Sequence, residues 1–266
     1  MGDRSALRKL ARTMARWLGP HASMWILLAV GAALVLAFSW AGGEVYESVV
    51  QHDALASLDQ PVLNWAVAAR TPALNSAVTA FTNVGGGVIA PIVAAAATAL
   101  LTLWMRHWRP LVLIPAAALG SLLATVFGKQ VTGRARPPLT LAVPPYEHTP
   151  SFPSGHTLNA TVIAGIVAYL VCLKLRQTWA RVAVIAAAAL YAVAIGLSRV
   201  FLGHHWLTDV VAAWFLGLAW LTFVIVAHRV FHLVRLARVA NAAAGAHDAA
   251  AGPPSSSSSR GDAAAG

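Results

Sequence analysis

Long apolar runs constrain this chain more than any other feature of its sequence. Of the 266 residues, 58% are hydrophobic and only 11% are charged, whereas a soluble domain has about 25% charged residues. A helix of about 20 apolar residues reaches across the hydrocarbon core of a bilayer. The runs and their spacing therefore predict an all-α, polytopic membrane protein with six transmembrane helices.

The runs and the polar segments between them divide the chain into five parts. We expect a basic cytoplasmic N-terminal arm at 1–23, a first transmembrane helix at 24–42, an extracytoplasmic segment with interfacial helices at 43–85, a five-helix core at 86–227, and a basic stub with a disordered cytoplasmic tail at 228–266. A basic start before an apolar run is also typical of a signal peptide. The first run is longer than a usual signal core, so a retained helix is expected. The acids of the extracytoplasmic segment are expected to form a solvated face.

The net charge of +10 would favour a nucleic-acid partner in a soluble protein. Here the basic residues lie mostly between apolar runs, without interleaved aromatic residues or a nucleic-acid motif, so the bilayer is the expected partner. The single cysteine, Cys172, excludes an internal disulfide and a cysteine-rich metal site. Neither a metal nor another cofactor is expected, and the sequence carries no signal for an oligomeric state.

The basic residues also predict the orientation. Most of them fall in the N-terminal arm, in the turns at 105–110 and 174–181, and in the stub, which places both termini in the cytoplasm. Three polar insertions, at 129–137, 153–156 and 198–209, then share the extracytoplasmic side. Their cations run against the positive-inside bias, so we expect an active site at the extracytoplasmic ends of the helix bundle.

The third insertion combines a histidine and a carboxylate at helical spacing. His205 and Asp209 are four residues apart and share one helix face. A carboxylate that holds one imidazole nitrogen as N–H leaves the other nitrogen as an oriented lone pair, which suits a nucleophile or a base. Taken alone, the pair is also typical of an interfacial helical ion pair, and Arg199 of a side chain that reaches lipid headgroups.

The second insertion, 153–156, opens an apolar helix. Ser154 is a favourable N-cap residue, and the free N–H groups of a first helical turn bind anions. Gly155 would allow the backbone to approach a ligand closely, and His156 would lie where it can protonate a leaving oxygen. An ordinary N-cap with an interfacial histidine explains the same four residues without a site.

In the first insertion, Lys129 and Arg136 flank a turn at Gly133. A lysine supplies a point charge, and an arginine supplies a planar fork that matches phosphate oxygens. Arg134 adds a third cation. A basic loop that contacts lipid headgroups is the alternative interpretation.

Together the three insertions resemble the signature of the type 2 phosphatidic acid phosphatase superfamily. Its three parts are Lys-x6-Arg-Pro, Pro-Ser-Gly-His and Ser-Arg-x5-His-x3-Asp, and all of them occur here in order, at 129–137, 153–156 and 198–209. The resemblance covers about 86–227. Soluble vanadium-dependent haloperoxidases carry the same signature, but the apolar spans argue against that relationship.

The resemblance implies a role for each matching residue. His205 would attack phosphorus and form a phosphohistidine, Asp209 would orient His205, and His156 would protonate the leaving alcohol and then activate water. The residues that would bind the phosphate are Lys129, Arg136, Ser154, Gly155 and Arg199. Two polar residues lie outside the signature: His204 is expected to support the site or face the interface, and Arg134 to contact the substrate headgroup.

The implied activity is metal-independent hydrolysis of a lipid phosphate or diphosphate in a bacterial inner membrane, with the site facing the periplasm or exterior. Polyprenyl diphosphate, phosphatidic acid and phosphatidylglycerol phosphate share the phosphoryl group that the motifs would bind, and the sequence does not rank them. The alternative is a catalytically silent lipid-phosphate-binding or transport relative. Transport is disfavoured because the charges lie at helix ends and not at the bilayer midplane.

Overall fold

The computed structural model describes residues 22–53 and 55–251, and all regular elements in this part of the chain are helical. In chain order they are α2 (Ala22–Gln51), η1 (Ala56–Leu58), α3 (Asp59–Ala68), α4 (Pro72–Asn83), α5 (Ile89–Met105), α6 (Arg109–Thr132), η2 (Leu139–Leu141), α7 (Gly155–Lys174), α8 (Thr178–Phe201) and α9 (Leu207–Ala251). The predicted all-α fold is confirmed for these residues. The expected N-terminal arm lies almost wholly outside them.

Five helices in the described part of the chain are long and apolar enough to cross a membrane: α2, α6, α7, α8 and the Leu207–Val239 part of α9. The first helix of the predicted five-helix core at 86–227 corresponds to α5, which has 17 residues and a length of about 26 Å at about 1.5 Å per residue. A count of six crossings therefore stays a prediction. Large apolar side chains such as Leu100, Phe127 and Leu190 remain mostly exposed on the outer surface, which suits contact with lipid.

Helix α7 forms the centre of the bundle and contacts α5, α6, α8 and α9. Its residues Leu158, Val162, Ile166 and Leu170 are spaced by four and are fully buried. Residues four apart lie on one helix face, so this row forms the axis of the main hydrophobic core. The core fixes the ends of the surrounding helices, which carry the polar insertions.

Helices α6 and α9 run antiparallel and approach closely at Gly120. A Cβ atom there would lie 2.0 Å from the Trp220 ring, so only glycine fits. The indole N–H of Trp220 donates a hydrogen bond of 3.0 Å to the carbonyl of Ala117. These contacts hold the two helices together midway between the two ends of the bundle.

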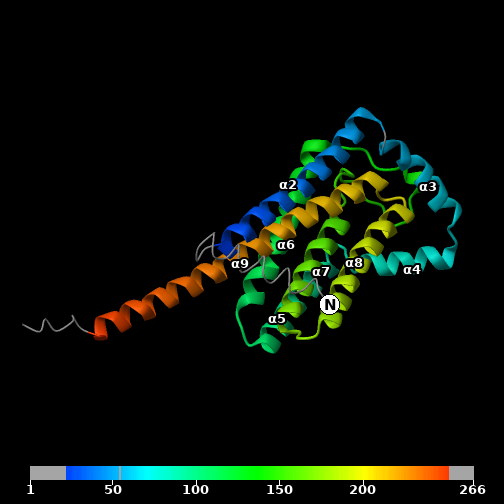
Figure 1. Cartoon of the computed structure of the whole chain (residues 1–266). Coiled ribbons are helices and arrows are strands. Elements are labelled where there is room, and N and C mark those ends of the chain that lie inside the picture. Colours follow the sequence, from blue (N-terminus) through cyan, green and yellow to red (C-terminus); the bar gives the residue numbers. More distant parts are fainter. Residues whose placement is uncertain (1–21, 54, 252–266) are drawn as a thin grey trace, which may run out of the picture.

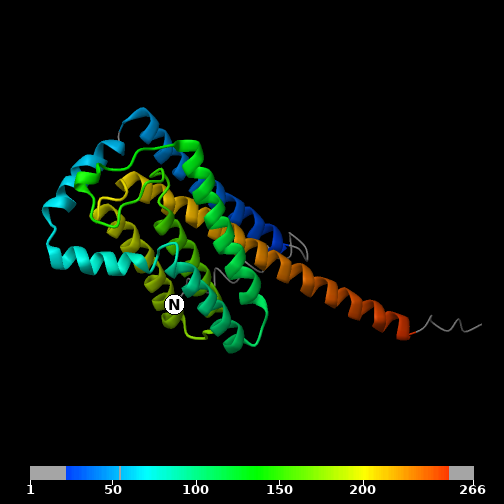
Figure 2. The ribbon, with the colours of Figure 1, turned by 180° about the vertical axis from the view of Figure 1, so that it is seen from behind.

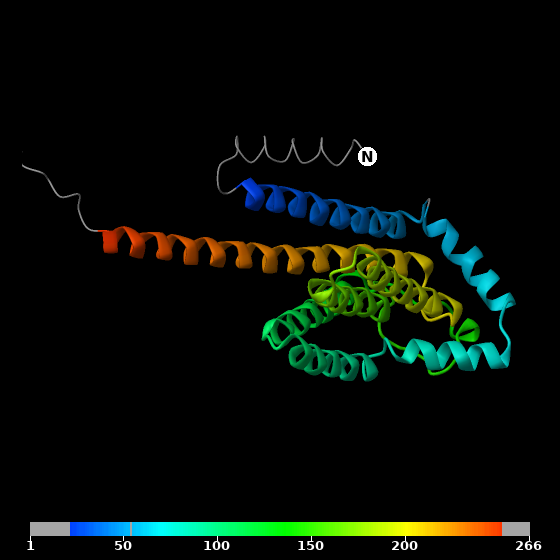
Figure 3. The same ribbon diagram turned by 60° about the horizontal axis from the view of Figure 1, so that its bottom comes forward.

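Helix α2 packs along α9, and the C-terminal half of α9 extends well beyond the bundle (Figures 1 and 3). Both helices are longer than the sequence predicted, because α2 continues to Gln51 and α9 to Ala251. The sequence predicted a basic stub and a disordered tail over 228–266. Alanine has the highest helix propensity, and the structure continues α9 as a helix over 240–251.

Helices α3 and α4 lie on the outer side of α8 (Figure 2) and correspond to the short helices predicted in 43–85. Thr71 caps α4 by accepting a hydrogen bond of 3.2 Å from the amide of Leu74. Between the two helices, Arg70 donates hydrogen bonds to the carbonyls of Phe201 (2.7 Å) and Leu141 (2.6 Å). This arginine thus ties the α3–α4 segment to the end of α8 and to the loop that contains η2.

Candidate active site

The three polar insertions meet at one end of the bundle, where α6 and α8 end and α7 and α9 begin. Two glycines in the left-handed backbone conformation form turns at this end. Gly133, with φ of 56°, terminates α6, and Gly203, with φ of 73°, turns the chain after α8. A Cβ atom on Gly203 would lie 2.4 Å from the carbonyl oxygen of Leu141. Both positions therefore favour glycine.

His205 and Asp209 form the buried centre of the site. His205 is 1% exposed, and its Nδ1 lies 3.3 Å from Oδ2 of Asp209. The same carboxylate oxygen accepts a hydrogen bond of 2.9 Å from the amide of Trp206. With the Nδ1 proton directed at the carboxylate, the Nε2 lone pair faces away from Asp209, and it lies 3.2 Å from Nη1 of Arg136. Burial and the nearby Arg136 guanidinium lower the pKa of His205 well below its ordinary value, so the imidazole is neutral at pH 7.

Arg136 and Arg199 share one carboxylate, that of Glu147. Nη2 of Arg136 lies 2.7 Å from Oε2 of Glu147, and Nη2 of Arg199 contacts Oε1. Burial opposes ionisation of Glu147, but the two guanidinium groups hold its pKa at about 2. The Nε–H of the buried Arg199 has no hydrogen-bond partner. The two arginines therefore already hold an anionic group between them and retain a free donor.

Lys129 approaches the same place from the last turn of α6. Its ammonium group donates a hydrogen bond of 3.0 Å to the hydroxyl of Thr149 and a second one to the carbonyl of Pro150. Arg136 donates to the carbonyl of Thr149 at 2.6 Å. The loop before α7 thus holds the lysine and this arginine side by side.

The start of α7 differs from its predicted role in two respects. Ser154 occupies the N-cap position, but its hydroxyl makes no cap hydrogen bond and accepts one of 2.9 Å from Thr157. A Cβ atom on Gly155 would lie 3.0 Å from the Thr125 methyl group. This glycine therefore permits close packing against α6, whereas close approach to a ligand was the predicted reason. The amide of Ser154 donates to the backbone carbonyl of Asp209 at 3.2 Å, which joins α7 to the His205 segment.

His156 lines a cavity of about 420 Å³ that opens beside the arginines. The other lining residues come from α4, the α4–α5 connection, the start of α5, the loop before α7, the end of α8 and the turn after it: Thr79, Thr82, Asn83, Gly86, Gly87, Val88, Ile89, Pro145, Tyr146, Glu147, Arg199 and His204. A Cβ atom on Gly86 would lie 3.2 Å from Nε2 of His156. The glycine leaves this nitrogen accessible from the cavity.

His204 lies close to Arg136, whose Nη1 donates a hydrogen bond of 2.6 Å to the backbone carbonyl of His204. Its Nε2 lies 2.6 Å from the carbonyl oxygen of Val143 and donates to it. Burial and Arg199 lower the pKa of His204 to about 4, so the ring is neutral. His204 also lines the cavity beside His156 and Arg199, so its supporting role stays a prediction.

Asp59 and Arg134 form a buried network behind Asp209 that the sequence analysis missed. Arg134 bridges two carboxylates, with Nη1 at 2.5 Å from Oδ1 of Asp209 and Nη2 at 2.7 Å from Oδ2 of Asp59. Asp59 also accepts hydrogen bonds from the amide (2.9 Å) and the hydroxyl (2.7 Å) of Thr208. Two predictions are therefore corrected: Asp59 is 4% exposed and does not belong to a solvated face, and Arg134 points at carboxylates and not at a headgroup.

A signal for Asp59 was present in the sequence. The apolar residues Val62, Leu63 and Ala66 follow it at spacings of three, four and seven, which places the carboxylate on the buried face of α3. No such pattern marks Glu147, which lies in an irregular loop between two motifs. The described residues contain no group of three or more His, Cys, Asp or Glu side chains placed to hold a metal ion.

One family model and several known proteins match this chain in sequence or in fold. The family model of the PAP2 superfamily matches residues 109–232. Phosphatidylglycerophosphatase B of Bacillus subtilis (strain 168) is 30% identical over 176 residues, which cover 65% of this chain and 85% of that protein. The crystal structure of a transmembrane PAP2-type phosphatidylglycerolphosphate phosphatase from Bacillus subtilis superposes with a TM-score of 0.63 at 28% identity, covering 73% of this chain and 93% of that one. Aquifex aeolicus LpxE shares the fold, with a TM-score of 0.50 at 22% identity over 63% and 94% of the two chains.

Proposed function

Because this chain belongs to the PAP2 superfamily and is a membrane lipid phosphatase of that family, we propose that it hydrolyses a lipid phosphomonoester through a phosphohistidine at His205. The proposal rests on the arrangement of side chains around Nε2 of His205. A neutral imidazole with an outward lone pair lies beside two guanidinium groups that together hold an anion. Phosphoryl transfer requires little beyond such positioning and charge stabilisation.

In the first step, Nε2 of His205 attacks phosphorus, and the P–O bond to the leaving alcohol breaks. Lys129, Arg136 and Arg199 stabilise the phosphoryl oxygens as charge spreads over them. The carboxylate of Glu147 lies where these oxygens would bind. The phosphate of the substrate therefore displaces this carboxylate, and the loop that carries Glu147 has to move. Asp209 stabilises the imidazolium that forms.

In the second step, water attacks the phosphohistidine and releases inorganic phosphate. His156 is the group proposed to handle protons in both steps, because its Nε2 faces the cavity through which a leaving group would exit. The anionic phosphoryl group of the bound substrate favours the imidazolium form of His156, which first gives its proton to the leaving oxygen. The neutral imidazole that remains then takes a proton from the attacking water, which returns His156 to its starting state.

Phosphatidylglycerol phosphate is the substrate that we propose first. The cavity beside His156 presents the hydroxyl and amide side chains of Thr79, Thr82 and Asn83. A phosphatidylglycerol leaving group carries a hydroxyl and a phosphodiester that can form hydrogen bonds with such side chains. The diacylglycerol leaving group of phosphatidic acid has fewer polar groups for these hydrogen bonds. The two Bacillus subtilis relatives are named for activity on the same lipid.

A substrate panel tests this function. Purified protein in mixed micelles should release phosphate from phosphatidylglycerol phosphate with a kcat/KM about tenfold or more above that for phosphatidic acid, because a few buried hydrogen bonds in the cavity contribute about 1.4 kcal/mol or more. Polyprenyl diphosphate is the third substrate, and phosphate release is measured colorimetrically. If folded protein releases phosphate from none of the three, the catalytically silent alternative replaces this proposal.

Metal independence is a further part of the proposal. The charge that a metal ion would supply to the transition state comes here from Lys129, Arg136 and Arg199. Activity on the preferred lipid should therefore stay within about twofold after dialysis against a chelator. The measurement compares dialysed protein with and without added Mg²⁺. Loss of turnover on dialysis and recovery with the metal would contradict the three-cation mechanism.

The distribution of basic residues supports a proposal for the orientation in the membrane. We propose a bacterial inner membrane, with the active site on the periplasmic face and both termini in the cytoplasm. The support is the concentration of basic residues at the opposite end of the bundle, in the α5–α6 turn, in the α7–α8 turn and on α9 beyond Ala227.

A further inference from the structure

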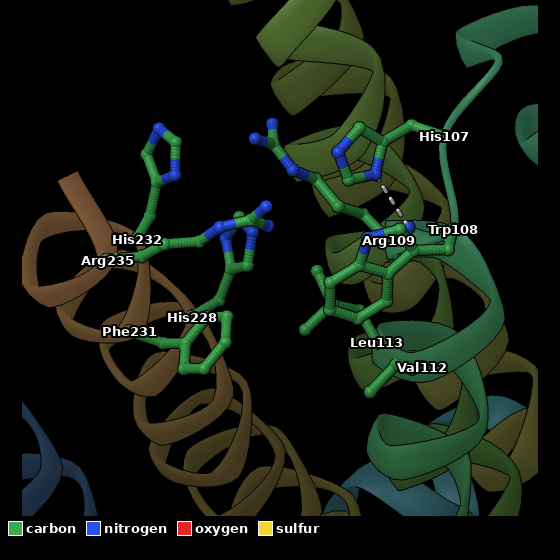
Figure 4. A pocket seen from close by; sticks show the side chains of 9 residues that line it. All are labelled: His107, Trp108, Arg109, Val112, Leu113, His228, Phe231, His232 and Arg235. Carbon is green, nitrogen blue, oxygen red and sulfur yellow. Dashed lines mark hydrogen bonds between the residues drawn. The ribbon is translucent and has the colours of Figure 1, made fainter. Parts of the chain in front are cut away.

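A second basic cavity lies far from the catalytic end. It measures about 210 Å³ and is formed by the α5–α6 turn, the start of α6 and one face of α9 (Figure 4). Its lining comprises His107, Trp108, Arg109, Val112, Leu113, His228, Phe231, His232 and Arg235. Five of these nine side chains are histidine or arginine and none is acidic, so the cavity favours an anion.

The α9 side of the cavity is a regular helical face. His228, His232 and Arg235 are spaced by four and seven from the first residue, which places them on one side of the helix. Figure 4 shows this face opposite His107 and Arg109 across the cavity. His228 is fixed by a hydrogen bond of 2.7 Å between its Nδ1 and the Tyr169 hydroxyl.

The α6 side is also fixed. Nδ1 of His107 accepts a hydrogen bond of 3.1 Å from the amide of Arg109, so the second ring nitrogen carries the proton and can donate. Burial, Arg109 and Arg235 lower the pKa of His107. No ion pair within the described residues involves the guanidinium group of Arg109 or Arg235. Their charges are therefore not neutralised by the described part of the chain.

The length of helix α6 gives the distance between this cavity and the active site. Arg109 begins the helix, and Lys129 lies 20 residues further along it (129 − 109). At about 1.5 Å per residue the two side chains are separated by about 30 Å, which is the thickness of the hydrocarbon core of a bilayer. The cavity thus lies at the membrane surface opposite the catalytic one.

We propose that this cavity binds the phosphate of an anionic phospholipid headgroup in the leaflet opposite the active site. Two unpaired guanidinium groups match phosphate oxygens, and histidine N–H groups complete the set of donors. The rim is apolar and exposed, with Trp108, Phe231 and Val112 each about half exposed. A free anion would not use that rim, whereas acyl chains would pack on it and continue along α6 and α9. The lipid at this cavity is a bound partner and not a substrate.

Native mass spectrometry of the detergent-solubilised full-length protein tests the proposal. Phosphatidylglycerol, phosphatidylethanolamine and inorganic phosphate are titrated separately into wild type, Arg109→Gln/Arg235→Gln and a matched control, Arg176→Gln/Arg238→Gln. The control removes two exposed basic residues outside the cavity lining. We expect wild type and control to retain one phosphatidylglycerol that the cavity variant binds about tenfold more weakly, because two charge-assisted hydrogen-bonding groups are lost. All three proteins should hydrolyse a soluble phosphate ester equally, which shows that the variants are folded.

Three outcomes would overturn the proposal. The first is equal phosphatidylglycerol retention by the cavity variant and wild type, which would assign the lipid to another surface. The second is equal retention of phosphatidylethanolamine at the cavity, which would remove the requirement for an anion. The third is cavity-dependent binding of inorganic phosphate without cavity-dependent binding of phosphatidylglycerol, which would identify a free anion as the ligand.

Discussion

A His205→Asn variant is expected to lose phosphate release from lipid substrates by about five orders of magnitude, to the background rate. Removal of a catalytic nucleophile from an enzyme typically costs about 10⁶ in kcat, and asparagine has no lone pair that can take its place. His205 is the only residue of the described site whose neutral, carboxylate-held nitrogen lies beside Arg136. The measurement is phosphate release under saturating lipid, with rates normalised to folded protein.

The control separates catalysis from binding. The cations of the site do not depend on the imidazole, so the variant should still bind inorganic phosphate with an affinity within about threefold of wild type. His148→Asn makes the same chemical change on an exposed histidine of the neighbouring loop and should leave turnover unchanged. Substantial turnover by His205→Asn would assign the nucleophile to another group.

An Asp59→Asn variant is expected to lower kcat about 10- to 100-fold and to change KM little. Asp59 holds Arg134, which holds Asp209, which orients His205. A displacement of a catalytic group by about 1 Å can cost about 10²-fold in rate. The side-chain contacts of Asp59 are with Arg134 and Thr208 and not with the cations proposed to bind phosphate, so substrate affinity should persist. The thermal midpoint should also fall, because a buried carboxylate with three donors loses about 1–3 kcal/mol on conversion to the amide.

Two comparisons make this result specific. Asp53→Asn makes the same change on an exposed carboxylate six residues earlier and should have no effect on kcat or melting. Restoration of the thermal midpoint by added lipid should leave the kcat of Asp59→Asn low, because the defect lies in the orientation of His205. A variant that is unstable but has wild-type kcat per folded molecule would reduce Asp59 to a structural role.

The sequence located the side chains that meet in the candidate site better than it located the contacts that support them. His205, Asp209, Arg136 and Arg199 are recognisable because each lies within a short local motif of the sequence. Contacts such as that between Arg134 and Asp59 join segments 75 residues apart, and no local pattern encodes them. The apolar periodicity of α3 nonetheless contained a usable signal, since it placed one acid on a buried face.

Packing explains the remaining differences. Gly155 was assigned to ligand approach, but the structure gives it a neighbour on α6, and such an interhelical contact cannot be read from one helix alone. Glu147 lies in a loop without periodicity, so only its position in space reveals that it bridges two arginines. Hydropathy located the apolar part of α9 but not its length, because the polar and alanine-rich continuation remains helical to Ala251.

Covalent trapping tests the central proposal most directly. Wild-type protein is mixed with a lipid phosphate that carries ³²P in its terminal group, quenched with alkali within milliseconds, digested and mapped by mass spectrometry. A phosphohistidine is stable in alkali and labile in acid, which separates it from phosphoserine and acyl phosphates. The mechanism predicts an alkali-stable label on the peptide that contains His205, absent from His205→Asn. A label on His156, or turnover without any label at the earliest quench times, would contradict it.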